Sequence, residues 1–328
     1  MAEMDRPGLT FIPLAPTFGA ECYGVDFSRP VPAEMVEAIR EGMAQYGVLV
    51  FRGTALDDEK HVAFAAQFGE LDDATTWIQP GQKYRLAPWS QLWDVGNIEV
   101  DGKVVGTDSL RHQIGRGNGL FHVDCSYNPR RAGFSLLRAH ELPPPGTGGG
   151  TAFADTRAAY DGLDAATKER IGDLVLAHSL WHSRRLGAAD NEIMRQIRPE
   201  DHAMARHRLV QCHEPSARMN LYIAWHAHHV DGWTREESQP LIEELLRHAS
   251  QDKYTFQVDW KNNDDLIIWD NTCVMHKACG GSYQGRYARD MRRATVLDSS
   301  STAWGLNNKD AERAGMFSRE MKNTNWVK

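Results

Sequence analysis

The sequence feature that most restricts the fold of this chain is the triplet His122-Val123-Asp124, which lies in the stretch 118–127. In an extended strand, residues i and i+2 point to the same face, so the imidazole and the carboxylate project side by side. Such a pair can supply two ligands of a metal site. A third ligand must then come from elsewhere, so the fold has to bring a distant segment against this one.

A triplet of this kind is a weak signal by itself. With 14 His and 44 acidic residues in 328, chance gives about two His-x-Asp or His-x-Glu triplets, and the chain has two, at 122–124 and 229–231. The segment 226–231 is rich in His and could bind metal, but Val230 stands where the metallo-β-lactamase pattern His-x-His-x-Asp-His needs Asp. We interpret this segment as a wall near a substrate or as a structural turn. For 122–124 the alternatives are a metal site and a polar pair at the end of a sheet.

Composition excludes several classes of protein. Hydrophobic residues make up 41% and charged residues 25% of the chain, which is ordinary for a globular protein. No apolar run is long enough to span a membrane, and the first residues lack the pattern of a signal peptide. The formal net charge of -7, without a basic tract, argues against nucleic acid as a partner. Five scattered Cys without a Cys-x-x-Cys motif indicate a reduced, cytoplasmic chain.

The spacing of apolar residues predicts more strands than helices around the candidate site. This pattern favours a mainly β fold, a sandwich or jelly roll, with helices outside it. The segment 70–117 is either a functional loop or a plain surface excursion, and 187–207 is polar and resembles a mobile insert. Helices are predicted over 32–46, 57–69, 158–178 and 234–250, and strands over 48–51, 133–142, 221–225, 254–260, 265–270, 291–297 and from 151 onward.

Several segments in a characteristic order carry a family resemblance: Val48–Gly53, Phe64–Gly69, Phe121–Asp124, Gly149–Asp155, Arg157–Tyr160, Ile268–Asn271, His276 and Arg292–Leu297. Together they resemble the Fe(II)/2-oxoglutarate-dependent dioxygenases of the taurine dioxygenase and 2,4-dichlorophenoxyacetate dioxygenase family. The segments 101–104 and 157–161 look closer to the dichlorophenoxyacetate branch. The resemblance implies a double-stranded β-helix, a cupin-like jelly roll, in agreement with the strand pattern. It also implies one domain over 1–328, with a core over about 14–298 and a tail over 299–328.

The resemblance assigns the metal centre to His122, Asp124 and His276, which would also be the catalytic residues. A lone His that follows a strand is more often structural, so the assignment of His276 depends almost wholly on the resemblance. Asp124 favours oxygen chemistry, because related halogenases lack this carboxylate. Asn118 matches a polar residue beside the iron, where it would contact the co-substrate and the substrate.

Two arginines, Arg289 and Arg293, are four residues apart and flank the last predicted strand, and residues i and i+4 of a strand share a face. A guanidinium can hold a carboxylate by two parallel N–H bonds, although the pair could also be plain surface charges. The resemblance gives Arg289, assisted by Thr151, the distal carboxylate of 2-oxoglutarate, and gives Arg293 the anionic group of the substrate. A buried guanidinium without a partner is costly, so either a protein carboxylate pairs with Arg293 or the site is open to an anion.

The function that the resemblance implies is an Fe(II)- and 2-oxoglutarate-dependent dioxygenase. Such an enzyme uses O2, releases succinate and CO2, and oxidises, most often hydroxylates, an unactivated C–H of a small organic anion. Alternatives are desaturation, cyclisation or epimerisation on the same scaffold, and a non-catalytic jelly-roll binding protein. The chain departs from the family at Phe121, where Trp is usual, and in the long segments 70–117 and 146–150, which leaves the substrate open. We expect a homo-oligomer, a dimer or tetramer.

Overall fold

The fold consists of two main sheets that face each other, with helices outside them. The computed structural model describes residues 8–78 and 83–314. The strands are β1 Thr10–Pro13, β2 Ala20–Tyr23, β3 Val48–Phe51, β4 Leu92–Asp94, β5 Ala132–Glu141, β6 Thr151–Asp155, β7 Val175–His178, β8 Ala205–Arg208, β9 Val210–His213, β10 Arg218–Leu221, β11 Ala227–Val230, β12 Thr255–Val258, β13 Leu266–Asp270, β14 Val274–Ala278 and β15 Asp290–Leu297.

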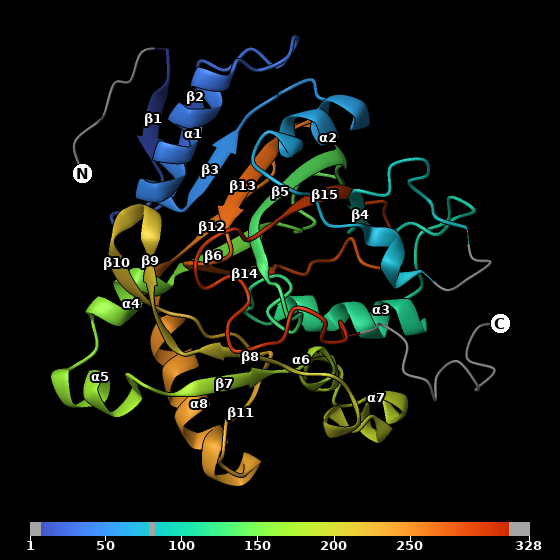
Figure 1. Ribbon diagram of the computed structural model, residues 1–328. Coiled ribbons are helices and arrows are strands. Elements are labelled where there is room, and N and C mark those ends of the chain that lie inside the picture. Colours follow the sequence, from blue (N-terminus) through green and yellow to red (C-terminus); the bar gives the residue numbers. More distant parts are fainter. Residues whose placement is uncertain (1–7, 79–82, 315–328) are drawn as a thin grey trace.

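The large sheet has the order β1-β2-β3-β13-β5-β15-β4, and the small sheet has the order β12-β6-β14. Their strands pair antiparallel, except for β2 with β3. Smaller sheets, β11-β7-β8 and β10-β9, lie beyond the small sheet (Figure 1). This arrangement of opposed sheets agrees with the predicted jelly roll.

Side-chain alternation in β13 explains how the large sheet is covered on both faces. Leu266 and Ile268 belong to the core cluster that includes Ile39 and Phe64 of the first two helices. The residues between and after them, Ile267 and Trp269, belong instead to the core between the sheets. Because successive side chains of a strand point to opposite faces, an apolar run without alternation is what a strand buried on both faces requires.

The small sheet is also buried on both faces. Phe153 of β6 lies in the core between the sheets, whereas its neighbours Ala152 and Ala154 pack into the core cluster that contains Leu245 and Leu246. Small Ala side chains on the outer face let a helix approach the sheet closely. The strand that carries Thr151 at its start is therefore fixed from both sides.

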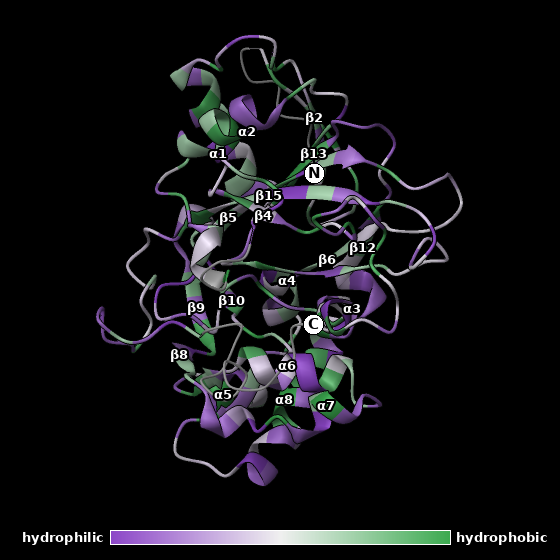
Figure 2. Ribbon diagram, turned by 90° about the vertical axis from the view of Figure 1, so that its right-hand side faces the viewer, coloured by the Kyte–Doolittle hydropathy of each residue, from purple (hydrophilic) through white to green (hydrophobic). Residues whose placement is uncertain are grey.

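Side chains cap most of the α-helices. Asp57 caps α2 through a bond from the Lys60 amide, and Thr234 with Glu237 forms a capping box at the start of α8. In Figure 2 the ribbons of α7 and α8 change between purple and green, as expected of helices with one face on a core. The helices are α1 Ala33–Tyr46, α2 Asp58–Ala66, α3 Leu110–Gly115, α4 Thr156–Asp161, α5 Ala165–Ile171, α6 Leu180–Gly187, α7 Glu192–Gln196 and α8 Arg235–Ala249, with single 3-10 turns η1 Ala74–Trp77, η2 Arg116–Gly119, η3 Pro199–Asp201, η4 Glu214–Ser216 and η5 Asp252–Tyr254.

Two predictions about elements were wrong. The predicted helix 158–178 is two short helices, α4 and α5, followed by strand β7, and the predicted strand 221–225 is β10, which begins at Arg218 and ends at Leu221. The segment 187–207, predicted as a polar and mobile insert, contains α7, η3 and most of β8. Residues 70–117 likewise contain η1, β4, α3 and the start of η2.

The segment after β15 packs back onto the core in its described part. Arg313 forms an ion pair of 2.8 Å with Asp72, and Ala314 is buried in a cluster with Tyr127 and Leu180. The rest of the predicted tail, 315–328, lies outside the described residues. No described helix has both the length and the apolar character that crossing a membrane requires.

Candidate metal centre

The backbone brings His122 and His276 together. The two residues form an isolated antiparallel bridge, in which the His122 amide donates to the His276 carbonyl at 2.9 Å and the His276 amide donates to the His122 carbonyl at 2.7 Å. Residues opposite each other in such a pair project to the same face, and the ring centroids lie 4.2 Å apart. The pairing of β14 with the segment before β5 therefore brings together two histidines that are 154 residues apart in the sequence.

Asp124 completes a group of three possible metal ligands. One ligand atom from each of His122, Asp124 and His276 lies within 4.8 Å of the others, and all three residues are buried. Neighbours fix both the carboxylate and the backbone of Asp124: Ser135 Oγ donates to Oδ2 at 2.7 Å, and the backbone amide of Asp124 donates to Asn271 Oδ1 at 2.9 Å. Partners of this kind orient a ligand before the metal arrives.

The protonation states suit a divalent metal. Burial lowers the pKa of His122 to about 4 and the pKa of His276 well below its usual value. Burial would raise the pKa of Asp124, but the Arg293 guanidinium and the two imidazoles lower it to about 2. His122 Nδ1 lies 2.7 Å from the Leu120 carbonyl oxygen, which requires Nδ1 to be the donor and leaves Nε2 unprotonated. At neutral pH the group offers two neutral imidazoles and one carboxylate.

Arg289 lies against the glycine turn that precedes β6. Its Nε and Nη2 both donate to the Gly149 carbonyl oxygen, at 3.1 and 2.9 Å. Gly149 has φ +91°, and a Cβ there would lie 3.0 Å from Arg289 Nε, so glycine allows the close approach. Burial lowers the pKa of Arg289, and no described carboxylate forms an ion pair with it. Thr151, two residues beyond Gly149, is buried at the start of β6.

Arg293 is paired with a metal-ligand candidate. Its Nη1 bonds to Asp124 Oδ1 at 2.5 Å, its Nε donates to Thr295 Oγ1 at 3.1 Å, and its guanidinium lies over the Trp93 ring at 5.5 Å. Burial would lower the pKa of Arg293, but Asp124 raises it. Of the two alternatives that the sequence left open for Arg293, a protein carboxylate as partner is the one that the structure shows.

Asn118 contacts an arginine that the sequence reasoning missed. Arg184 of α6 donates from Nη1 to Asn118 Oδ1 at 2.6 Å. Burial lowers the pKa of Arg184, whose electrostatic neighbours are Tyr127, Asp124 and Arg293. No motif marks this position. The available signal was a pair of arginines, 184 and 185, three positions beyond the apolar residues 180–181.

Only His226 of the His-rich segment 226–231 lies at the centre. Its ring centroid is 5.5 Å from that of His122, and its Nδ1 is 3.0 Å from Ser126 Oγ. His228 pairs with Glu200 instead. His226 therefore forms a wall beside one ligand candidate, while the rest of the segment belongs to strand β11.

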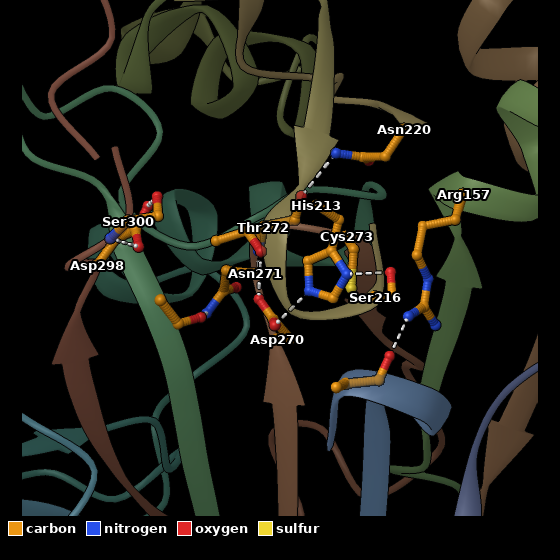
Figure 3. Close-up of polar contacts among 12 residues, drawn as sticks. Arg157, His213, Ser216, Asn220, Asp270, Asn271, Thr272, Cys273, Asp298 and Ser300 are labelled. Atoms are coloured by element: carbon orange, nitrogen blue, oxygen red, sulfur yellow. Dashed lines mark hydrogen bonds and ion pairs between the residues drawn. The ribbon is translucent and has the colours of Figure 1, made fainter. Parts of the chain in front are cut away.

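A second cluster, His213, Asp270 and Cys273, lies nearby but its imidazole is already in use. His213 Nε2 is 3.0 Å from Asp270 Oδ2 and Nδ1 is 2.6 Å from Ser216 Oγ, as Figure 3 shows. Burial would lower the pKa of His213, but Cys273 and Asp270 raise it to about 10. Both nitrogens of this imidazole therefore already have polar partners. The cluster instead joins β9 to the turn that carries Asn271.

Two neutral imidazoles and one carboxylate within a jelly roll are typical of non-heme Fe(II) dioxygenases. The family model described as "Taurine catabolism dioxygenase TauD, TfdA family" matches residues 10–295, and the chain belongs to this family. It is 39% identical over 269 residues to the α-ketoglutarate-dependent 2,4-dichlorophenoxyacetate dioxygenase of Burkholderia sp. (strain RASC), covering 81% of this chain and 86% of that protein. The enzyme of the same name from Cupriavidus pinatubonensis is 36% identical over 291 residues, or 88% and 97% of the two chains.

A solved structure supports the same class. The crystal structure of AAD-2 in complex with Mn(II) and N-oxalylglycine superposes with a TM-score of 0.80 at 37% identity, covering 89% of this chain and 98% of that chain. The chain is therefore an oxidoreductase, a dioxygenase that depends on Fe(II), 2-oxoglutarate and O2 and acts on a small organic substrate. This confirms the predicted fold class and activity, and it does not favour the alternative outcomes or a non-catalytic binding protein.

Proposed function

We propose that His122, Asp124 and His276 hold the Fe(II), and that Arg289 and Thr151 bind the distal carboxylate of 2-oxoglutarate. The observation that carries this assignment is the donor set, two neutral imidazoles and one carboxylate within 4.8 Å. Three ligands of this kind leave positions for the co-substrate and O2. The bound iron supplies the oxidation that couples decarboxylation of 2-oxoglutarate to attack on a C–H bond.

The protein residues then have distinct tasks. Ser135 and Asn271 hold Asp124 in one orientation, and the Leu120 carbonyl selects the tautomer of His122. The Gly149 carbonyl accepts from Nε and Nη2 of Arg289 and so fixes the orientation of the guanidinium. The remaining N–H groups can then hold the carboxylate of 2-oxoglutarate in one direction. Burial of the ligands keeps bulk water from the reacting atoms.

We propose further that the substrate is a small organic anion and that the usual outcome is hydroxylation. The named substrate of two relatives, 2,4-dichlorophenoxyacetate, is a carboxylate, and a third relative, from Pseudomonas putida and 28% identical, is a sulfate ester dioxygenase. Both kinds of substrate carry a negative charge. The cationic residues around the centre are in keeping with such a charge.

The test begins with the Fe(II) protein under anaerobic conditions. Addition of 2-oxoglutarate should give a weak visible charge-transfer band, and O2 with 2,4-dichlorophenoxyacetate should then release succinate. His276→Ala should lose the band and reduce succinate release by about a hundredfold or more, since loss of a ligand acts at least as strongly as loss of an outer partner. The exposed His140 provides the control, His140→Ala. A band and activity that survive in His276→Ala would show that the third ligand is misassigned.

A further inference from the structure

The long segment 70–117, which links α2 to the metal centre, runs along the last strand of the large sheet. Within it, β4 pairs with β15 at Arg292–Ala294, and the two strands lie side by side in Figure 1. The Val95 amide extends this pairing by donating to the Met291 carbonyl at 3.0 Å. The segment therefore follows β15 toward Arg289, the residue that the proposed function assigns to 2-oxoglutarate.

Asn97 continues the contact at the point where β15 begins. The Arg289 amide donates to Asn97 Oδ1 at 2.7 Å, and the Asn97 amide donates to the Arg289 carbonyl at 3.0 Å. Asn97 Nδ2 donates to the Tyr287 carbonyl at 3.0 Å. A primary amide suits this place, because one planar group offers both an acceptor and donors. One residue thus binds both backbone polar groups of Arg289.

Arg289 is therefore held at both of its ends. The Gly149 carbonyl accepts from Nε and Nη2 of the guanidinium, at 3.1 and 2.9 Å, and Asn97 holds the backbone from which the side chain starts. The side chain between these two ends is buried. With both ends fixed, the direction of the remaining N–H donors is defined before a carboxylate arrives, which is what a binding group needs in order to orient its ligand.

Ion pairs anchor the segment that carries Asn97. Asp94, at the end of β4, pairs with Arg85 at 2.7 Å and with Arg111 at 3.1 Å. Arg85 also pairs at 2.8 Å with Asp290, the neighbour of Arg289. These pairs join the segment to β15 independently of the Asn97 side chain. A substitution of Asn97 therefore removes a local contact and leaves the attachment of the segment intact.

Gly96 makes the close approach to Arg289 possible. A Cβ at position 96 would lie 2.9 Å from the Arg289 carbonyl oxygen and 3.2 Å from the Asp290 Cα. These neighbours are backbone atoms, which cannot move away as the end of a flexible side chain can. Gly96 is not among the glycines with positive φ, so the space and not the backbone conformation requires glycine here.

We propose that Asn97 is a positioning residue for 2-oxoglutarate, because it holds the Arg289 backbone and so directs the guanidinium at the distal carboxylate. This inference rests on the proposed function and gives a task to the segment 70–117. Asn97 acts through Arg289 and not on the metal ion. Its loss should therefore weaken 2-oxoglutarate binding and leave metal binding unchanged.

The test measures the Kd of 2-oxoglutarate for the Fe(II) protein under anaerobic conditions, from the growth of the visible charge-transfer band. Asn97→Ala should raise this Kd by about tenfold, since the Arg289 amide loses its acceptor in a buried place. Calorimetric titration with Mn(II) in the absence of 2-oxoglutarate should give the same Kd for the metal in both proteins. This second measurement separates a misdirected Arg289 from a disturbed metal centre.

A double-mutant cycle with Arg289→Ala shows whether Asn97 acts through the guanidinium. In the Arg289→Ala background there is no guanidinium to direct, so Asn97→Ala should raise the Kd of 2-oxoglutarate no further. A general loosening of the site would instead raise the Kd by a similar factor in both backgrounds.

A pair of glycine variants tests the same contact by another route. Gly96→Ala keeps the Asn97 side chain but pushes against the Arg289 carbonyl, so it should also raise the Kd of 2-oxoglutarate. Gly115 lies in the same segment, and a Cβ there would meet nothing within 4 Å, so Gly115→Ala should leave the Kd unchanged. If Asn97→Ala does not fold, Gly96→Ala and its combination with Arg289→Ala decide the question.

The outcomes distinguish this inference from the proposed function. If 2-oxoglutarate gives no band with the wild type, the proposed function fails. If Arg289→Ala leaves the Kd unchanged, Arg289 is not the anchor, and the role of Asn97 is overturned with it. If Arg289→Ala raises the Kd but Asn97→Ala and Gly96→Ala do not, or if Asn97→Ala has its full effect without the guanidinium, Asn97 is not a positioning residue and the metal centre stands.

Discussion

Arg289 is a buried cation, and among the described residues its guanidinium has only the Gly149 carbonyl as a hydrogen-bond partner. An uncompensated guanidinium in this position costs folding free energy that an incoming carboxylate can return. Arg289 therefore lowers the folding stability of the protein without 2-oxoglutarate and raises its affinity for 2-oxoglutarate. Gly149 contributes by leaving the backbone oxygen open to it.

Arg289→Ala should raise the 2-oxoglutarate concentration needed for half-maximal succinate release by about a hundredfold or more, because breaking a buried charge pair costs about 3–5 kcal/mol. The affinity for 2,4-dichlorophenoxyacetate should change far less. Arg286, exposed and three positions earlier, gives the matched control Arg286→Ala. An unchanged requirement for 2-oxoglutarate in Arg289→Ala would remove its role as the co-substrate anchor.

At the residue scale the structure places the side chains of His122 and Asp124 close together, as the sequence predicted. The predicted reason was a shared strand face, but His122 forms an isolated bridge and Asp124 lies in the turn that follows it. His276 could be reached only through a resemblance, because its proximity depends on a backbone bridge between distant segments. For Arg184 the sequence offered only a pair of adjacent arginines, because its contact with Gly117 appears only after folding.

At the scale of elements, capping residues determine where helices begin and end, which the periodicity of apolar residues does not show. The predicted helix 158–178 divides because Gly162 ends α4 and the Asp164 side chain accepts from the Thr167 amide to begin α5. Gly172 then ends α5 before strand β7. The long, well-patterned elements, such as α8 and β13, were predicted to within a residue or two. Short elements between glycines were not, since their apolar positions fit more than one period.

The glycine turn before β6 offers a test at this scale. Gly148 has φ +91°, and a Cβ there would lie 2.6 Å from the Gly280 carbonyl oxygen, whereas Gly146 has φ +80° with nothing within 4 Å. Gly146→Ala should cost only the strain of its backbone, about 1–2 kcal/mol. Gly148→Ala should lower the free energy of unfolding further and weaken 2-oxoglutarate binding through its neighbour Gly149. Urea titrations of both variants check this, and equal costs would contradict the backbone contact.

At the scale of the whole molecule, buried neutral histidines govern stability in mild acid. Burial lowers the pKa of His61, His178 and His182 to about 3, and that of His207 well below its usual value. Below pH of about 6.5 the unfolded chain binds these protons and the folded chain does not, so stability falls as the pH falls. His213 acts oppositely: its pKa of about 10 makes its contribution complete below pH 6.5 and lost as the pH rises through 10.

The free energy of unfolding should therefore decrease from pH 6.5 toward pH 4, by about 1.4 kcal/mol per pH unit for each such histidine. Urea titrations at several pH values measure the slope. His61 Nε2 lies 3.0 Å from the Leu136 carbonyl oxygen, and His61→Gln keeps a donor for that oxygen. This variant removes one titrating group, so the dependence of the free energy of unfolding on pH should decrease by the contribution of one proton. A slope that is flat between pH 6.5 and 5, or the same in His61→Gln, would contradict this account.

The oligomeric state, predicted as a dimer or tetramer, can be measured by light scattering.

The backbone bridge between His122 and His276 has a consequence for the life of the enzyme. Amide-to-carbonyl bonds hold these imidazoles side by side whether or not an ion is present. We therefore expect the protein to fold without the metal, unlike small domains that fold only around zinc. A chelator should strip the ion and leave a compact apoprotein, and fresh Fe(II) should restore it without a refolding delay. When iron is scarce, the cell would then contain folded apoenzyme that regains activity on binding Fe(II), and this apoenzyme would not be degraded as an unfolded protein is.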